Sequence, residues 1–396
     1  MEWKEVTLGD LCEISSSKRI FAKEYQSDGV PFYRGKEIIA KQKGNAISNE
    51  LFISRNRYEE IKARYGVPQQ RELLLTSVGT LGVPYVIKEE DFYFKDGNLT
   101  WFRHFNGLDV EYLYYWFLSP YGKNEINTKA IGSTQKALTI DSLSKFDIKI
   151  PANLDDQRRI ASILSSLDRK IELNNKINAD LEEMAQAIFK NWFVDFEPFK
   201  DGKFVDSELG MIPEGWKVGG LFDIAEIFDK KRKPLSGNVR EKMDKIYPYY
   251  GATSCMDYVD DYIFDGIYTL IGEDGSVVKE NGLPYMQYVW GKMWVNNHAH
   301  ILQGKNGYST EMIHVLLSIT NIKFLVTGAV QAKLSQGNMQ KILVAIPPKN
   351  VLDEIRPVID NLYSKIRSLS DENSRLSLLR DTLLPRLMSG ELEVPE

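Results

Sequence analysis

Residues 132–151 read GSTQKALTIDSLSKFDIKIP, and residues 328–347 read GAVQAKLSQGNMQKILVAIP. The two stretches align without a gap, and their shared positions include Gly132/Gly328, Gln135/Gln331, Leu138/Leu334, Lys145/Lys341, Ile150/Ile346 and Pro151/Pro347. Identities at a constant spacing indicate internal duplication, and a duplicated chain is built from one repeated structural unit. The sequence therefore predicts that the 396 residues contain the same unit twice.

The beginning of each unit is repeated as well. A Trp-Lys pair occurs at residues 3–4 and again at 216–217, each time before an apolar stretch. A Lys-Arg pair follows at residues 18–19 and, at the same offset, at 231–232. Between these shared ends the two halves differ almost completely. The pattern indicates one conserved frame that is used twice, with a different middle each time.

A long amphipathic helix is predicted after each frame. Apolar residues recur in alternating steps of four and three over about 35 residues, which would make each helix roughly 50 Å long, and the two stripes match at an offset of 195. Asn178 and Asn373 occupy matching positions of this seam, where a buried Asn fixes register. Pro357 is expected to kink or delay the second helix, and Pro385 and Gly390 to end it. The predicted helix seam or subunit interface consists of Leu167, Ile171, Asn178, Leu181, Phe189, Trp192, Phe193, Leu362, Ile366, Asn373, Leu376 and Leu387.

Short strands are predicted outside the helices. Runs rich in β-branched and aromatic residues, such as 73–78 and 268–271, lie between closely spaced Gly and Pro residues. The predicted fold class is therefore mixed α/β (α+β), with two globular domains of similar fold. The predicted boundaries are a first domain at 1–151, a central helix and linker at 152–210, a second domain at 211–348 and a distal helix at 349–396.

The net charge of −5 argues at first against a nucleic-acid partner, because phosphate binding requires a basic surface. The charge is unevenly distributed, however. Residues 1–151 carry 21 Lys and Arg against 20 Asp and Glu, and residues 211–348 carry 14 against 14. The acidity lies on the helical segments, with 8 against 12 in residues 152–210 and 7 against 9 in residues 349–396. Both globular domains are therefore free to carry local basic patches.

The sequence contains no apolar run of the roughly 18 residues that a membrane span requires, and its first residues do not resemble a secretion signal. We therefore expect a cytoplasmic protein that has no membrane partner. Cys12 and Cys255, its two cysteines, are expected to be reduced thiols.

Signals for catalysis are weak. No phosphate-binding loop of the G-x-x-x-x-G-K-[ST] type occurs, and neither does the Asn-Pro-Pro-aromatic run of an adenine methyltransferase. Residues 79–82 read as a turn, and His298 and His300 lack an acidic partner motif for a metal site. We predict no catalytic residue, no metal and no cofactor on this chain.

Basic clusters are the better candidates for function, because a Lys-Arg pair recurs at one place in both units. Arg and Lys would hold phosphates, and neighbouring polar residues would read base edges. The predicted DNA-binding residues are Lys18, Arg19, Arg34, Lys36, Lys41, Lys43, Gln135, Lys136, Lys230, Lys231, Arg232, Lys233, Gln331 and Lys333.

Two specific runs suggest a family. Residues 191–199 read NWFVDFEPF, and residues 207–216 read SELGMIPEGW. Together with LPRLMSGE at 384–391, these runs resemble the specificity (S, or HsdS) subunit of Type I restriction-modification systems. The resemblance covers the whole chain in the family's domain order. The run LIGEDGS at 270–276 is similar to a common turn of its recognition domains, whereas the first half departs from this turn at 76–80.

The resemblance implies two target-recognition domains, each of which reads one half of a bipartite asymmetric site in double-stranded DNA. The two helices are then expected to pack antiparallel as a coiled-coil spacer and to dock two methyltransferase (M) subunits, which restriction/translocase (R) subunits join. S-adenosylmethionine, ATP and Mg would belong to these partners. Two isolated chains are also expected to be able to associate through their helices.

Two alternative functions remain open at this point. One is a self-contained nuclease or methyltransferase that carries duplicated recognition domains, and the missing motifs argue against it. The other is a coiled-coil scaffold with two protein-binding domains, which a preference for one bipartite DNA sequence would exclude.

Overall fold

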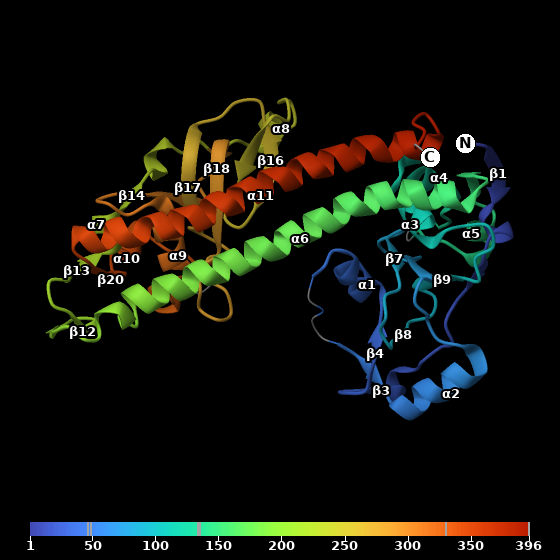
Figure 1. The fold of residues 1–396 in the computed structure, drawn as a ribbon, viewed down its shortest axis with the longest axis horizontal. Helices are drawn as coiled ribbons and strands as arrows, with labels where there is room; N and C mark the ends of the chain where they lie inside the picture. The colour runs from blue at the N-terminus through green and yellow to red at the C-terminus, as the bar shows by residue number, and fades with distance from the viewer. Residues whose placement is uncertain (46, 48–49, 133–135, 329–330, 395–396) are drawn as a thin grey trace. The chain divides into compact units, whose positions relative to one another are not determined.

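The structure, a computed structural model, describes residues 1–45, 47, 50–132, 136–328 and 331–394. The chain divides into two compact units: unit 1 consists of Met1–Glu172 and Asn373–Glu396, and unit 2 of Leu173–Glu372. Each unit contains one globular domain and a segment of each long helix (Figure 1). The predicted mixed α/β fold with an internal repeat is confirmed.

The first globular domain is built from short elements. They are β1 (Trp3–Thr7), β2 (Glu13–Ser15), β3 (Tyr25–Gln26), β4 (Val30–Tyr33), α1 (Gly35–Gln42), β5 (Phe52–Ile53), α2 (Arg55–Tyr65), β6 (Leu73–Thr76), β7 (Pro84–Val86), β8 (Tyr93–Phe94), β9 (Leu99–Arg103), α3 (Val110–Leu118), α4 (Pro120–Lys129), α5 (Ile140–Ser144) and β10 (Asp147–Pro151). Strands form a four-stranded sheet in the order β2-β9-β6-β7, a second sheet in the order β3-β5-β4-β8, and the antiparallel pair β1-β10.

The second globular domain follows the β11–β12 hairpin (Phe204–Ser207 and Gly210–Pro213). Its elements are β13 (Lys217–Gly220), α7 (Leu221–Ile224), β14 (Ala225–Ile227), α8 (Gly237–Arg240), β15 (Tyr247–Tyr250), β16 (Cys255–Val259), β17 (Phe264–Gly272), β18 (Met286–Val295), β19 (Ala299–Gly304), α9 (Thr310–Ser318), α10 (Gln336–Met339) and β20 (Leu343–Ile346). Six strands form one sheet in the order β14-β19-β17-β18-β15-β16, and β13 pairs with β20.

Strand register makes the two domains comparable residue by residue. The order β2-β9-β6-β7 in the first domain corresponds to β14-β19-β17-β18 in the second, and β1-β10 corresponds to β13-β20. Thr76 pairs with Leu99 at the end of β6, as Gly272 pairs with Ala299 at the end of β17. The variable middles account for the remaining strands, which are a separate sheet in the first domain and two added strands, β15 and β16, in the second.

Each frame is followed by one long helix, α6 (Leu154–Phe193) or α11 (Lys349–Ser389). These helices contain 40 and 41 residues, more than the predicted 35 or so, and each is about 60 Å long. Pro357 does not delay the start of α11, which begins at Lys349, and the expectation that Pro385 helps to end the helix was wrong, because α11 continues to Ser389. It ends before Gly390, whose positive φ of 80° favours a residue without Cβ at the helix end.

Within each unit the two helix segments run antiparallel. In unit 1, Arg380 Nη1 donates to Asp168 Oδ1 over 2.7 Å. In unit 2, Asn174 Nδ2 donates to Glu372 Oε2 over 2.9 Å, and Asn178 Nδ2 donates to Ser370 Oγ over 3.1 Å. None of the twelve predicted seam residues is exposed.

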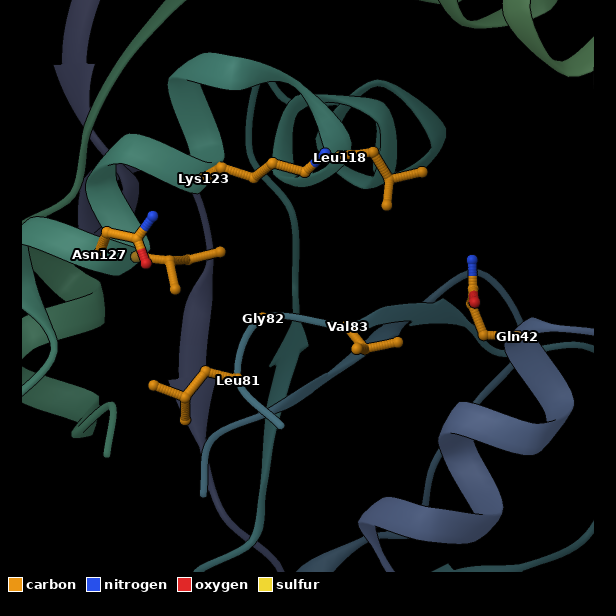
Figure 2. Close-up of a pocket in the computed structure, with 8 residues that line it drawn as sticks. Gln42, Leu81, Gly82, Val83, Leu118, Lys123 and Asn127 are labelled. Atoms are coloured by element: carbon orange, nitrogen blue, oxygen red, sulfur yellow. The ribbon is translucent and has the colours of Figure 1, made fainter. Parts of the chain in front are cut away.

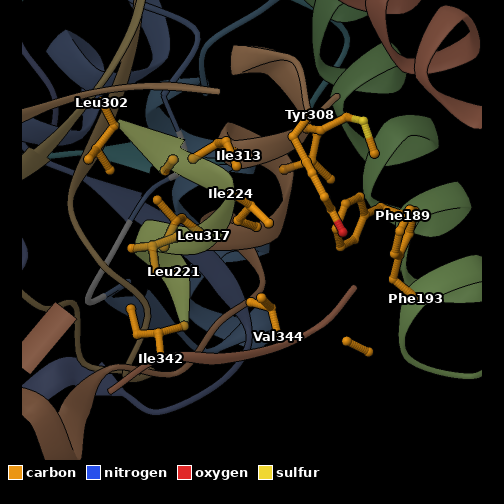
Figure 3. Close-up of a cluster of buried hydrophobic side chains, with 14 of the residues drawn as sticks. Phe189, Phe193, Leu221, Ile224, Leu302, Tyr308, Ile313, Leu317, Ile342 and Val344 are labelled. Carbon is orange, nitrogen blue, oxygen red and sulfur yellow. The ribbon is translucent and has the colours of Figure 1, made fainter. Parts of the chain in front are cut away.

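The core of unit 2 gathers around the C-terminal end of α6. Phe189 and Phe193 are buried and stack with ring centroids 4.4 Å apart, and Phe193 also meets the edge of Trp216. Figure 3 shows both phenylalanines facing Tyr308. Phe189, Trp192 and Phe193 were predicted to belong to a helix seam or subunit interface. In unit 2, Phe189 and Phe193 belong to a buried core cluster that also contains residues of the second globular domain, and Trp192 packs against it. No helix in the described part of the chain is both long and apolar enough to cross a bilayer.

Candidate nucleic-acid interface

The repeated stretches 132–151 and 328–347 overlap at their N-terminal ends with a small loop whose described residues pair in the same way in both domains. Ile131 bridges Ala137 in the first domain, as Thr327 bridges Lys333 in the second. We call residues 131–138 and 327–334 the frame loops, and the structure describes residues 131–132 and 136–138 of the first and 327–328 and 331–334 of the second. Each is also bonded to the turn that follows the central strand of its sheet, since Leu138 N donates to Ser77 O and Leu334 N to Glu273 O, over 2.9 and 2.8 Å.

These central turns require glycine at the same place. Gly79 and Gly275 have positive φ values of 83° and 76°, which only glycine adopts without strain. Open space surrounds the position of an added Cβ at either residue, so backbone conformation and not crowding explains the glycine. The interpretation of residues 79–82 as a turn is correct, and this turn lies beside the frame loop in each domain.

The predicted polar residues of the frame loops are at the surface where they are described. Lys136 and Gln331 are exposed, and Lys333 is 54% exposed with its Nζ 3.5 Å from Glu273 Oε1. Gln135 lies outside the described residues. The described part of each frame loop therefore carries at least one exposed polar side chain, although Lys136 and Lys333 are not at equivalent positions.

The repeated Lys-Arg pairs follow β2 and β14: Lys18 comes three residues after the end of β2, and Lys231 four residues after the end of β14. Lys18 and Lys231 are both exposed, and each amine lies over an aromatic ring, that of Tyr65 at 5.2 Å and that of Phe228 at 5.1 Å. These two lysines are available to a ligand and are held loosely by similar contacts. The recurrence seen in the sequence therefore extends to their surroundings.

The two arginines differ sharply. The Arg19 side chain is 67% exposed and pairs with Asp96 over 2.7 Å. The Arg232 side chain is only 13% exposed, and its Nη1 donates to Glu273 Oε2 and to the carbonyl of Ala299 over 2.7 and 2.8 Å. Arg232 is thus engaged inside the protein, which gives it no free donor array for a phosphate.

Arg232 belongs to a group of buried charges beneath the second frame loop. Its Nη2 lies 3.3 Å from Asp229 Oδ2, and the same oxygen is 2.5 Å from His300 Nδ1. Although burial acts to raise it, the hydrogen bonds from His300 and Gln336 and the charges of His300 and Arg232 hold the pKa of Asp229 below its ordinary value.

The same residues are of the types that bind metal ions. Ligand atoms of Asp229, Glu273 and His300 lie within 4.8 Å of one another. The guanidinium of Arg232 contacts both carboxylates and the amine of Lys333 lies 3.5 Å from Glu273, so two side-chain cations face the two carboxylates. His298, in contrast, is half exposed and lies 2.5 Å from Asp274, so the two histidines of the His-Ala-His run do not share a site.

The remaining predicted basic residues fall into two sets. Arg34 and Lys41 are partly buried in ion pairs with Glu37 and Glu90, each with a closest approach of 2.6 Å. Although burial acts to raise it, the hydrogen bonds from the side chain and backbone of Arg34 lower the pKa of Glu37. The exposed set comprises Lys36, Lys43, Lys230 and Lys233.

Sequence reasoning missed a cavity of about 260 Å³ in the first domain. Figure 2 shows Lys123 and Asn127 on α4, Gln42 on α1, and the loop that carries Leu81 and Gly82 around it. The loop continues the glycine turn beside the first frame loop. No signal of recurrence could reveal these polar residues, because they belong to the middle of the unit, where the halves differ.

The comparison with protein families gives one match that covers most of the chain. The family model described as Type I restriction modification DNA specificity domain matches residues 1–183 and 213–377. A similar protein is the Type I restriction enzyme MjaIX specificity subunit of Methanocaldococcus jannaschii, which is 27% identical over all of this chain and 94% of its own length. Another is the Type I restriction enzyme HindI specificity subunit of Haemophilus influenzae, 26% identical over 64% of this chain and 71% of that protein.

A solved structure shares the fold. The S subunit of a Type I restriction-modification system from M. genitalium superposes with a TM-score of 0.60 at 16% identity, over 98% of this chain and 96% of that one. The similarity extends over both globular domains and both long helices. The repeated arrangement of the chain is therefore found in a whole solved protein, and not only in one of its domains.

Proposed function

Because this chain belongs to the family of Type I restriction modification DNA specificity domains, we propose that it is the DNA-recognition subunit of a Type I restriction-modification complex. Each globular domain reads one half of a bipartite, asymmetric DNA site. The observation that carries this proposal is the double occurrence of three features around different middles: a frame loop, the glycine turn to which it is bonded, and an exposed lysine at one place in the repeat. A shared frame suits the DNA backbone, which is the same everywhere, and different middles suit two different base sequences.

Lysines at equivalent places, Lys18 and Lys231, contact phosphates in this proposal, with Arg19 beside the first. Further phosphate contacts come from the exposed Lys36, Lys43, Lys230 and Lys233. Lys136, Gln331 and Lys333 of the frame loops lie closer to the bases. Arg34, Lys41 and Arg232 are left out, because their side chains are committed to carboxylates inside the protein.

Helices α6 and α11 set the separation of the two half-sites and dock two methyltransferase subunits. Their antiparallel segments give both domains an equivalent place on the helix pair, which suits two identical partners. Equivalent groove positions recur about every 34 Å along DNA, so a fixed separation of the domains selects a fixed spacing of the half-sites. Restriction/translocase subunits join this core.

Chemistry is supplied by the partners in this proposal. The target adenine is flipped out of the duplex into a methyltransferase subunit, which also binds S-adenosylmethionine, while ATP and Mg belong to the restriction/translocase subunits. Both globular domains are nearly neutral in charge, so the complex, and not this chain alone, is the tight DNA-binding form. The complex works in the cytoplasm, where the DNA is.

The test is the methylation pattern of the host genome with and without this gene. The expected result is one bipartite sequence, with two different halves at a fixed spacing, that loses adenine methylation when the gene is deleted. An unchanged pattern, together with methyl transfer by the purified chain alone from labelled S-adenosylmethionine, would replace the proposal by a self-contained enzyme. Failure of the reconstituted complex to prefer any DNA sequence would favour the scaffold.

A further inference from the structure

The buried charges beneath the second frame loop are unusual, because burying a charge is unfavourable unless it is paired and hydrogen-bonded. Asp229, Glu273 and His300 come from three different segments and are largely buried, with side chains 4, 16 and 1% exposed. Arg232 ties the two carboxylates together. Such a costly arrangement calls for a reason beyond filling the core.

The contacts of this group converge on the frame loop. His300 Nε2 lies 2.7 Å from the carbonyl of Leu334, and the carbonyl of Glu273 accepts from Leu334 N over 2.8 Å. Just beyond the loop, Gln336 Nε2 donates to Asp229 Oδ2 over 2.7 Å, at the first residue of α10. Both the N–H and the carbonyl oxygen of Leu334 are therefore hydrogen-bonded, and these two bonds fix the position of the loop at its C-terminal end.

The first domain keeps the arginine of this group, as the exposed Arg19, but has uncharged residues at the other three positions. Strand register places Thr100 where the second domain has His300, and Ser77 where it has Glu273. Counting two residues beyond the paired Ile14 and Ile227 places Ser16 at the position of Asp229. The hydroxyls of Ser77 and Thr100 are hydrogen-bonded to each other, and the carbonyl of Ser77 accepts from Leu138 N. The shared frame is thus compatible with a neutral support, so the charges belong to what distinguishes the second domain.

We propose that Asp229, Arg232, Glu273 and His300 form a positioning network that sets the conformation of the second frame loop, and so determines how the second domain reads its DNA half-site. Only the statement about reading the DNA half-site rests on the proposed function; the statement about the loop conformation does not. His300 is the central positioning residue, because its ring connects the carboxylate of Asp229 to the backbone carbonyl of Leu334. Lys333, whose amine lies near Glu273, is the reading residue closest to the network.

Hydrogen–deuterium exchange of the free full-length protein tests the positioning without DNA. His300→Gln keeps an uncharged donor but removes one of the two ring contacts, and we expect the amides of residues 331–334 to exchange about tenfold faster. Exchange at residues 136–138 should stay unchanged. Thr100→Val in the first domain is the matched control and should leave residues 331–334 unaffected. Unaltered exchange of residues 331–334 in folded His300→Gln would overturn the proposal.

Selection from a randomised duplex DNA library, by the chain purified with its methyltransferase subunits, tests the consequence for reading. We expect His300→Gln to reduce discrimination at the second half-site about tenfold and to leave the first half-site unchanged. Equal effects on both half-sites, or a loosened loop with intact reading of the second half-site, would refute the assigned role. If wild type prefers no bipartite site, the proposed function fails, while the exchange measurement still decides whether the network holds the loop.

A second variant covers failure of the single substitution to fold. The triple change Asp229→Ser, Glu273→Ser and His300→Thr installs the neutral residues of the first domain. Arg232 is then free to turn outward as the equivalent Arg19 does. The variant is expected to fold and to keep its first half-site, with an altered preference at the second. An unaltered preference in this folded triple variant counts against the proposal.

Discussion

Lys231 and Arg232 are adjacent, and both were predicted from the sequence to contact phosphates, yet their surroundings predict opposite behaviour on substitution by alanine. Lys231 is exposed, and its amine lies 5.1 Å from the ring centroid of Phe228. Arg232 is 13% exposed and bonded to Asp229 and Glu273. Lys231→Ala should therefore change DNA binding and leave stability alone, whereas Arg232→Ala should change stability first.

The effect of Lys231→Ala follows from counterion release. One phosphate contact contributes about 0.9 to the slope of log affinity against log salt. The ratio of wild-type to variant affinity should then fall about 3.5-fold when salt is raised from 50 to 200 mM. The double variant Lys18→Ala/Lys231→Ala should lose about 1.8 of the slope, because the two lysines belong to separate domains and act independently.

The effect of Arg232→Ala follows from its burial. Removing one partner of a buried ion pair costs about 3–5 kcal/mol. Asp229 keeps His300 and Gln336, and Glu273 keeps Lys333 nearby, so the lower end of about 3 kcal/mol is expected. In a unit of 200 residues, this free energy lowers the melting temperature by roughly 6–12 °C.

Both effects are measurable on one set of proteins. Fluorescence anisotropy of a labelled duplex containing the genomic site, titrated with the complex at several salt concentrations, gives the slope. Thermal unfolding followed by circular dichroism gives the melting temperature, with Lys230→Ala as a neighbouring exposed control for stability. The reasoning is refuted if Arg232→Ala flattens the slope as Lys231→Ala does and leaves the melting temperature of unit 2 unchanged.

Three further substitutions test the structure at other places. Phe189→Ala, at a side chain 1% exposed, should destabilise unit 2 by about 3–5 kcal/mol in thermal unfolding, whereas Val194→Ala, at an exposed residue directly after α6, should stay within about 0.5 kcal/mol. Gly275→Ala should lose about 1 kcal/mol of stability from its positive φ, and an unchanged melting temperature would show that the turn tolerates a side chain. Burial lowers the pKa of His314 to about 4, so below pH 6.5 the unfolded chain binds a proton that the folded chain does not, and stability should fall by up to about 3 kcal/mol between pH 6.5 and 4. His314→Phe should remove this part of the acid dependence, and an unchanged pH profile of urea unfolding would contradict the assignment.

The repeat made much of the fold predictable. The two frames share residues at a fixed offset, and their frame loops have β-bridges at equivalent positions. The same backbone pairing is therefore formed in both copies. The heptad stripes predicted both helices. Helix α11 nevertheless continues through Pro357, which lacks an N–H and lies in the third turn of the helix. Packing of the apolar face against the core stabilises the helix despite the missing hydrogen bond. Strand order in the middles was beyond reach, since unrelated sequences have no shared pattern to align.

The candidate site was predictable only where chemistry and recurrence agree. Lys18 and Lys231 recur in sequence, exposure and aromatic contact. Arg232 and Arg19 match in sequence but not in exposure. The burial of Arg232 depends on its ion pairs with Asp229, in a neighbouring turn, and Glu273, at the end of another strand. A local motif does not contain the long-range partners that decide whether a charged side chain meets solvent or a carboxylate.

The discontinuity of unit 1 has a consequence for synthesis on the ribosome. The core of this unit contains Ile160 and Leu164 of α6 together with Leu384 and Leu387 of α11, yet the 200 residues of unit 2 come between them. At 5–20 residues per second, roughly 10–40 s separate the emergence of the two sides. During that interval the apolar stripe of α6 in unit 1 is synthesised but cannot yet pack against α11. Slow elongation within the second half of the chain would therefore favour aggregation of the first half.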